Sequence, residues 1–209
     1  MVYNKIDFNV LPKKQIQIYK KLRELPWLED FYLAGGTALT LQIGHRQSID
    51  FDFFSIKDFN NRIVKDNLSL IGEFTILSEE ENTIHGILEG VNLSFLGYKY
   101  PLLKDLMKDM HLKIAHLIDI ACMKLSAIII WRGNKKDFID LYFILQKYPL
   151  EDLLDWYAKK YQSYNYEYVL LKAITYFDDA EKDPMPIMLK KTDWVDVKKR
   201  LIEEARKMI

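Results

Sequence analysis

The chain lacks cysteine chemistry, long apolar runs and a net charge. Its 209 residues contain one cysteine, Cys122, which excludes an internal disulfide and a cysteine-based zinc cluster. No stretch approaches 18 consecutive apolar residues, and the first residues lack the apolar core of a signal peptide, so a membrane-spanning or exported protein is not expected. Thirty basic residues balance thirty acidic ones, which gives no general expectation of nucleic-acid binding. We expect a cytoplasmic protein with no membrane partner.

The histidines also lack a pattern that would indicate catalysis or metal binding. His45, His85, His111 and His116 are scattered along the chain, without a His-Glu-x-x-His motif. No spacing of serine, histidine and acid suggests a hydrolase. We therefore expect all four histidines to be structural or exposed.

The composition is that of a folded protein with a hydrophobic core. Hydrophobic residues make up 49% and aromatic residues 13%, which argues against disorder. Hydrophobic periodicity predicts helices at residues 12–24 and 57–71 and strands at 73–78, 83–89 and 91–98. From about residue 112 the pattern is helical to the end, with one helix starting at Pro149. The expected fold class is α+β: a mixed sheet with helices, followed by a helical lobe.

A paired glycine follows the first predicted strand. Residues 30–34 are expected to be extended and to end at Gly35 and Gly36, and residues 37–43 have the apolar spacing of a short helix. Glycines let a ligand approach the backbone, and the free N–H groups at a helix start favour phosphate. Thr37 would add a hydroxyl donor. A Gly-Gly pair in isolation is most often only a tight turn.

Two carboxylates follow on the next predicted strand, residues 49–54. Side chains alternate along a strand, so Asp50 and Asp52 share one face while Ile49, Phe51 and Phe53 occupy the other. Their α-carbons would lie on the order of 7 Å apart, close enough to share one Mg²⁺ or to bridge two ions. Just upstream, Arg46 and Ser48 offer a cation and a hydroxyl. The alternative is a half-buried strand with a solvated acidic face.

A second block of charged residues lies in the helical part. Lys124 falls within a mostly apolar helix that begins near Asp119, which suggests a cation directed at an anion. Arg132 then marks a helix end. In the following helix Asp137 and Asp140 are three residues apart and share a face, next to Lys136. The alternative is a charged surface with ion pairs to Lys124 or Arg132.

These motifs, taken in order, resemble the nucleotidyltransferase superfamily and, more narrowly, the AbiEii/AbiGii toxin family of abortive-infection and toxin–antitoxin systems. The first family motif is similar to residues 35–39 followed by 45–54, and the second to Lys124, Arg132 and residues 136–141. The resemblance covers about residues 30–145. It implies a nucleotidyltransferase-like α+β lobe over residues 1–110, a helical lobe over 111–209, and an active cleft between them.

The resemblance also implies an activity: metal-dependent transfer of a nucleoside monophosphate from a nucleoside triphosphate (NTP) to a hydroxyl of RNA, such as a tRNA 3′ end, or of a protein. Mg²⁺ or Mn²⁺ would be the cofactor, and a separately encoded antitoxin the partner. The implied catalytic residues are Asp50, Asp52, Lys124 and Asp137, the first two also being the metal ligands. The implied nucleotide-binding residues are Gly35, Gly36, Thr37, Arg46, Ser48, Arg132 and Lys136.

One departure from the resemblance affects the expected activity. Many nucleotidyltransferases carry a third carboxylate on a later strand, but residues 91–96 contain none and offer only Asn92 or Ser94, with Glu89 as a substitute before the strand. This favours, as the alternative function, a catalytically degenerate nucleotide-binding or interaction module of the same fold. A third possibility is a structural helical protein whose acids are surface residues.

The C-terminal segment 190–207 combines seven basic residues with Trp194, Val197 and Leu201 at helical spacing. We interpret it as an amphipathic helix with a solvated face. The alternative is an RNA contact surface.

Overall fold

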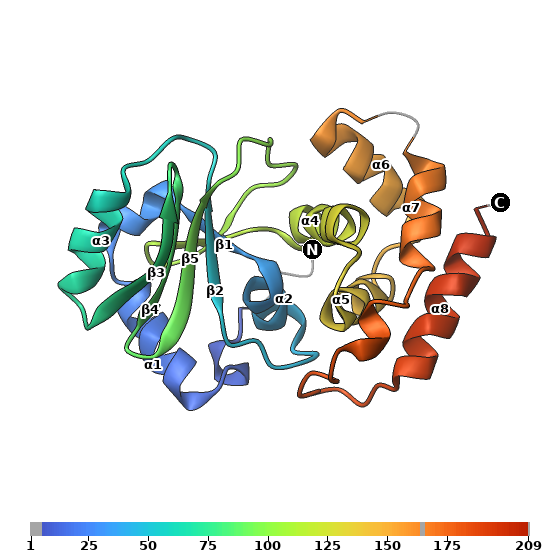
Figure 1. Cartoon of the computed structure of the whole chain (residues 1–209), viewed down its shortest axis with the longest axis horizontal. Coiled ribbons are helices and arrows are strands. Elements are labelled where there is room, and N and C mark those ends of the chain that lie inside the picture. Colours follow the sequence, from blue (N-terminus) through green and yellow to red (C-terminus); the bar gives the residue numbers. More distant parts are fainter. Residues whose placement is uncertain (1–5, 164–165, 209) are drawn as a thin grey trace. The chain divides into compact units, whose positions relative to one another are not determined.

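The computed structural model describes residues 6–163 and 166–208 (Figure 1). The chain forms two compact units, one of residues Met1–Pro101 and Asp105–His116 and the other of Leu102–Lys104 and Leu117–Ile209. The first unit contains a sheet with helices, and the second is helical. The predicted α+β class is therefore confirmed.

The first unit is built on a seven-stranded sheet. The strands lie in the order β3-β4-β5-β2-β1-β7-β6. β2 pairs in parallel with β5, and β1 with β7, while the remaining pairs are antiparallel, so the sheet is mixed. The strands are β1 Tyr32–Ala34, β2 Phe51–Ser55, β3 Phe74–Glu80, β4 Thr83–Leu88, β5 Val91–Gly97, β6 Met107–Asp109 and β7 Leu112–Ile114.

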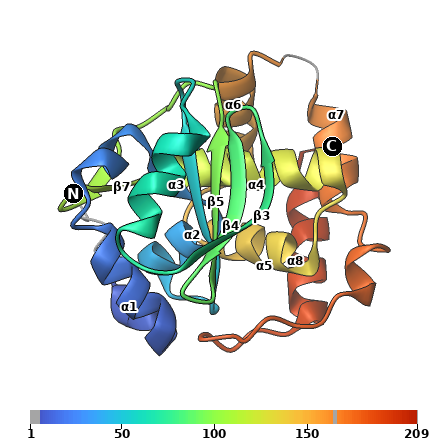
Figure 2. The same cartoon turned by 60° about the vertical axis from the view of Figure 1, so that its left-hand side comes forward.

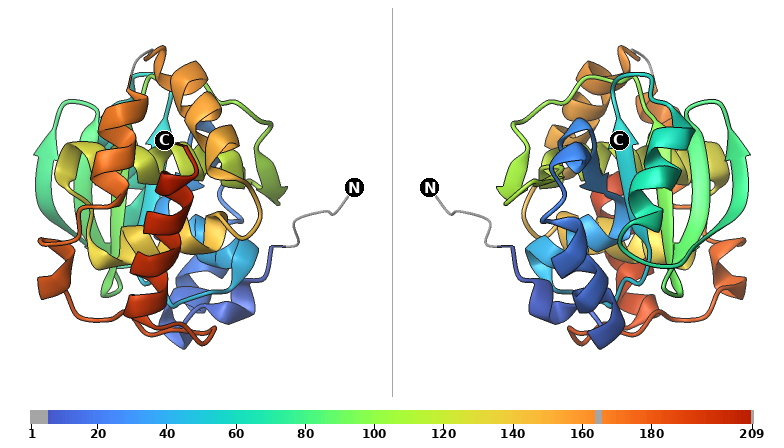
Figure 3. Two further views of the ribbon diagram at one scale, coloured as in Figure 1. Left: turned by 90° about the vertical axis from the view of Figure 1, so that its right-hand side faces the viewer. Right: turned by 90° about the vertical axis from the view of Figure 1, so that its left-hand side faces the viewer.

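One face of this sheet forms the core of the first unit. Phe51, Phe53 and Phe95 are fully buried there, and the last two rings stack with their centroids 4.9 Å apart. Helices α1 (Lys13–Leu22) and α3 (Asn61–Ser69) cover this face, and the right-hand view of Figure 3 has both in front of the strands. Because side chains alternate along strands, the other face carries Asp52 and its neighbours.

Helix α2 (Gly35–Ile43) connects β1 to β2 and packs against both. It begins two residues before the predicted start, because Gly35 and Gly36 form its first turn. It ends at Gly44, which adopts the left-handed conformation (φ 55°) typical of a helix C-cap. β2 begins at Phe51, so Asp50 directly precedes the strand.

The prediction of helix from about residue 112 was wrong. Residues 107–114 form the β6–β7 hairpin, and helix begins only at Leu117. The chain turns at Met110, which adopts a left-handed conformation (φ 56°). Leu112 and Ile114 are buried while Lys113 between them is half-buried, as expected for a strand, and β7 pairs with β1 so that the hairpin extends the sheet. Three residues are too few for this alternation to be separated from the apolar helix that follows.

The second unit is a cluster of helices around α4. Helix α4 contacts α5, α6 and α7, and α8 contacts α5 and α7 (Figure 2). Their bounds are α4 Leu117–Trp131, α5 Lys135–Ile144, α6 Leu150–Tyr161, α7 Glu167–Ile174 and α8 Trp194–Arg206. The start of a helix after Pro149 is confirmed. Val197 and Leu201 of α8 are buried, which confirms the amphipathic helix.

Cys122 is fully buried on α4, and burial raises the pKa of its thiol to about 12. It therefore serves as a small core residue. Within residues 6–163 and 166–208, no helix has the length and apolar character needed to cross a membrane.

Candidate nucleotide and metal site

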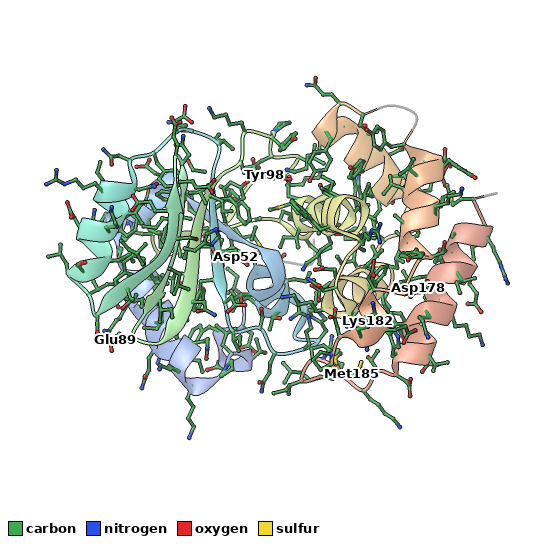
Figure 4. The ribbon with its side chains drawn as sticks, in the orientation of Figure 1. Asp52, Glu89, Tyr98, Asp178, Lys182 and Met185 are labelled. Atoms are coloured by element: carbon green, nitrogen blue, oxygen red, sulfur yellow. The ribbon has the colours of Figure 1, made fainter. Side chains whose placement is uncertain are left out.

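The site in the first unit begins where β1 meets α2. Ala34, the last residue of β1, lies opposite Asp52 of β2 in the antiparallel ladder. Gly35 follows in a left-handed conformation (φ 66°), and a Cβ atom there would lie 2.8 Å from Asp52 Oδ2. Figure 4 shows Asp52 beside α2. Position 35 therefore requires glycine for two reasons, its backbone conformation and the carboxylate against it.

The loop between α2 and β2 returns over the helix start. A Cβ atom on Gly36 would lie 2.7 Å from Arg46 Nη2 and 2.9 Å from Ser48 Oγ. Arg46 is 3% exposed, its Nη1 donates to the Gln47 carbonyl (3.0 Å), and its own carbonyl accepts from the Thr40 hydroxyl (3.0 Å). The loop thus holds a guanidinium and a hydroxyl directly against the paired glycine.

Thr37 holds the segment that leads to the acidic residues. Its buried hydroxyl donates to the Asp50 carbonyl and accepts from the Ser48 hydroxyl, the two oxygens lying 2.9 Å apart. In this structure the hydroxyl is therefore engaged with the protein, whereas the sequence suggested a donor to phosphate. Its effect here is to hold residues 48–50 against the first turn of α2.

Asp50 and Asp52 are both half-buried, and Asp52 lies on the face of β2 opposite the core. The neighbouring strand is β5, whose Ser94 lies beside Asp52 in the parallel ladder, and whose Asn92 donates from Nδ2 to Asp50 Oδ1 (2.9 Å). Ile49, predicted to lie on the apolar face, is 52% exposed because it precedes the strand.

β5 is the strand from which a third carboxylate would reach Asp50 and Asp52. At the neighbouring positions it carries the amide of Asn92 and the hydroxyl of Ser94. Glu89 is not a substitute. It lies in the β4–β5 turn, its carboxylate accepts the Glu73 backbone N–H (2.8 Å), and Figure 4 shows it well apart from Asp52.

The start of α2 presents a favourable environment for an anion. Ala34 at the N-cap has no side chain that could bond to the first-turn amides, and the first turn contains no acidic residue. Uncapped N–H groups and the positive end of the helix dipole attract phosphate. The Arg46 guanidinium lies against Gly36 in the same turn and adds positive charge.

The carboxylates fit a divalent cation only in part. Among the described residues no group of three or more acidic, histidine or cysteine side chains forms a complete metal site. Mg²⁺, however, is held in phosphate-transfer sites by one or two carboxylates together with substrate phosphates and water. Asp50 and Asp52, beside a phosphate-sized turn, match that ligand set.

The predicted residues of the second unit gather around the start of α5. Lys124 Nζ lies 2.7 Å from Asp137 Oδ1 and 2.8 Å from Asp140 Oδ2, and all three residues are buried. Asp137 also accepts the backbone N–H of Asn134 (3.0 Å) in a capping box. The shared face of Asp137 and Asp140 is confirmed, and within this unit the anions opposite Lys124 are these two carboxylates.

Two further predicted cations flank this cluster. Arg132 ends α4 in a left-handed conformation (φ 60°), and its exposed guanidinium lies 3.2 Å from Asp179 Oδ2. Lys136 is exposed in the first turn of α5. Sequence reasoning did not single out the adjacent Lys135, which is 6% exposed and donates to the carbonyls of Glu181 and Asp183. A lysine in a charged run carries no signal that would distinguish it from its neighbour.

The sheet topology, the glycine-containing first turn of α2 and the carboxylates at the start of β2 are those of a nucleotidyltransferase-type fold. Two solved structures from Helicobacter pylori share it: JHP933 (18% identity, TM-score 0.58, covering 95% of this chain and 93% of that one) and a protein assigned as a nucleotidyltransferase (19%, 0.57, 94% and 96%). At these identities the likeness concerns the fold.

Sequence comparison identifies the family. Residues 18–88 match the family described as "Nucleotidyl transferase AbiEii toxin, Type IV TA system". The uncharacterized protein aq_aa25 of Aquifex aeolicus (strain VF5) is 38% identical over 179 residues, which is 83% of this chain and 86% of that protein. The chain belongs to the AbiEii nucleotidyltransferase toxin family.

Proposed function

We propose that this protein transfers a nucleoside monophosphate from an NTP to a hydroxyl of an RNA, such as a tRNA 3′ end, or of a protein, with Mg²⁺ or Mn²⁺ as cofactor. The observation that carries this proposal is the convergence in the first unit of seven predicted residues at one end of β1 and β2. They are Gly35, Gly36, Thr37, Arg46, Ser48, Asp50 and Asp52.

Each of these residues has a task in the proposed reaction. The first turn of α2 and the Arg46 guanidinium bind the triphosphate, and Thr37 and Ser48 hold the loop that carries Arg46 in place. Asp50 and Asp52 hold the cation, which neutralises charge on the phosphates when bound. In the second unit, Lys124 and Asp137, the remaining residues proposed as catalytic, pair at the start of α5, and the exposed Arg132 and Lys136 are the cations proposed to contact phosphate.

The test follows label from each of the four α-labelled NTPs into total cellular RNA and protein, with Mg²⁺ or Mn²⁺. We expect incorporation by the unaltered protein and its loss in Asp50→Asn and Asp52→Asn. Asp66→Asn is the matched control, because Asp66 is an exposed aspartate of the same unit. Metal chelation should abolish the same signal. If Asp66→Asn and Asp52→Asn were equally active, the proposed site would be wrong.

The second candidate function is a nucleotide-binding module without turnover, which the amide and hydroxyl of Asn92 and Ser94 on β5 favour. It predicts that NTP binds, as measured by calorimetry, while no label is transferred. The biological role proposed for either function is that of a toxin relieved by a separately encoded antitoxin. Normal growth under strong induction of folded protein would count against that role.

A further inference from the structure

The side chains beside Asp52 form a row across the face of the sheet opposite the core. Asp52 lies next to Ser94 in the parallel β2–β5 ladder, and Ser94 lies opposite His85 in the antiparallel β4–β5 ladder. Paired residues in neighbouring strands point to the same face. Carboxylate, hydroxyl and imidazole therefore stand side by side on three adjacent strands.

The hydroxyl and the imidazole are directly bonded. Ser94 Oγ lies 2.9 Å from His85 Nδ1. Both side chains are half-buried, and their strand neighbours Ile84, Phe95 and Leu93 are buried on the opposite face, which fixes the direction of the pair. This arrangement is a hydrogen-bonded dyad held on rigid elements next to a proposed metal ligand.

The proposed transfer needs a group that can take a proton. The acceptor hydroxyl must lose its proton as its oxygen forms a bond to the α-phosphorus, and Asp50 and Asp52 are assigned to the cation. Histidine is the side chain used most often as a general base near neutral pH. Ser94 of this dyad lies on β5 beside Asp52, the strand on which a third carboxylate would otherwise be expected.

We propose that Ser94 and His85 replace the missing carboxylate as a proton relay for the acceptor, an inference that rests on the proposed function. The acceptor O–H donates to Ser94 Oγ, and the Ser94 proton passes to His85 Nδ1. The acceptor oxygen then forms the bond to the α-phosphorus, and the bond to the leaving pyrophosphate breaks. Ser94 contacts the acceptor, and His85 acts through it.

The experiment is a double-substitution cycle on the full-length chain. Transfer rate and NTP affinity are measured for the unaltered protein and for His85→Ala, Ser94→Asp and the double variant. General-base removal typically slows a reaction by about 10²- to 10⁴-fold, so we expect His85→Ala to lose at least about 100-fold in rate with unchanged NTP affinity. Ser94→Asp supplies a carboxylate beside Asp52, so the double variant should recover most of the rate.

The rescue distinguishes a relay from a merely structural histidine. Loss of packing at position 85 would not be repaired by an acid on β5, so a double variant as slow as His85→Ala would overturn the proposal. So would a His85→Ala protein that transfers at the normal rate. His111→Gln is the control, because His111 is a partly exposed histidine paired with Glu29 (2.6 Å). Absence of transfer by the unaltered protein would instead contradict the proposed function itself.

Discussion

At the scale of single residues, both the backbone conformation and the neighbouring carboxylate require glycine at position 35. Its φ of 66° disfavours any side chain, and a Cβ would lie 2.8 Å from Asp52 Oδ2. A residue with a side chain in the left-handed region costs roughly 1–2 kcal/mol. Gly35→Ala should therefore lose about that much stability, and it should also abolish transfer because Asp52 must move.

Gly44→Ala is the control that separates these two effects. Gly44 has a similar φ of 55°, and a Cβ there would only contact Val10 at 3.5 Å. The two variants should show similar losses in thermal unfolding experiments, while only Gly35→Ala should lose label transfer. Equal activity of the two variants would mean that the carboxylate tolerates displacement and that Gly35 is needed only for the turn.

The residues of the first motif could be identified from the sequence because their signal is local. Strand, paired glycine, helix and Asp-x-Asp lie within about 25 consecutive positions. Because α2 is short, the glycines at its start and the acids that follow it lie close together. The side chains that hold the motif were harder to assign. The hydroxyl of Thr37 bonds to Ser48 and Asp50, and nothing in a one-dimensional pattern separates such a bond from contact with a ligand.

At the scale of elements, prediction depended on length. Alternation over six or seven residues identified β3, β4 and β5, whereas β6 and β7, with three residues each, were taken as part of the helical region. β7 is stabilised by pairing with β1, a strand distant in sequence, through contacts such as Ala115 N–H to the Leu33 carbonyl (2.8 Å). Local propensity does not contain that information.

A buried ion pair connects α4 to α6, and the sequence did not indicate this contact. Lys160 of α6 lies 2.7 Å from Asp119 of α4, and both side chains are fully buried. Asp119 also accepts the backbone N–H groups of Leu103 (3.0 Å) and Lys104 (3.2 Å). One carboxylate thus joins two helices and the segment Leu102–Lys104.

Removing the lysine alone should destabilise this unit strongly. Breaking a buried ion pair costs about 3–5 kcal/mol, because the remaining charge is left without its partner. Lys160→Met should thus lower the midpoint of thermal unfolding by at least about 6 °C. Lys159→Met, on an exposed neighbouring position of the same helix, should change it little. Asp119→Asn added to Lys160→Met should recover part of the loss, and a double variant less stable than Lys160→Met would argue that Asp119 acts mainly through the backbone N–H groups.

At the scale of the whole molecule, the chain carries no net charge. Lysines and arginines equal aspartates and glutamates in number, so long-range attraction to a polyanion is weak. Three basic residues in and directly after α8 are paired with acids: Arg200 lies 3.0 Å and Lys207 2.6 Å from Glu204, and Lys198 pairs with Glu181. These ion pairs favour the solvated amphipathic helix over the RNA contact surface for this segment.

This balance leads to a prediction about binding without catalysis. Non-specific affinity for nucleic acid comes from the release of counterions by unpaired cations, so the protein should pass through a heparin column at about 0.15 M ionic strength, where the Debye length is about 8 Å. Lys190→Glu/Lys191→Glu, which alters the non-helical segment before α8, should pass through in the same way. Retention of the unaltered protein, with loss of retention in this variant, would instead locate a basic RNA surface at residues 190–207. Selection of an RNA acceptor would then depend on that surface as well as on the residues around Asp52.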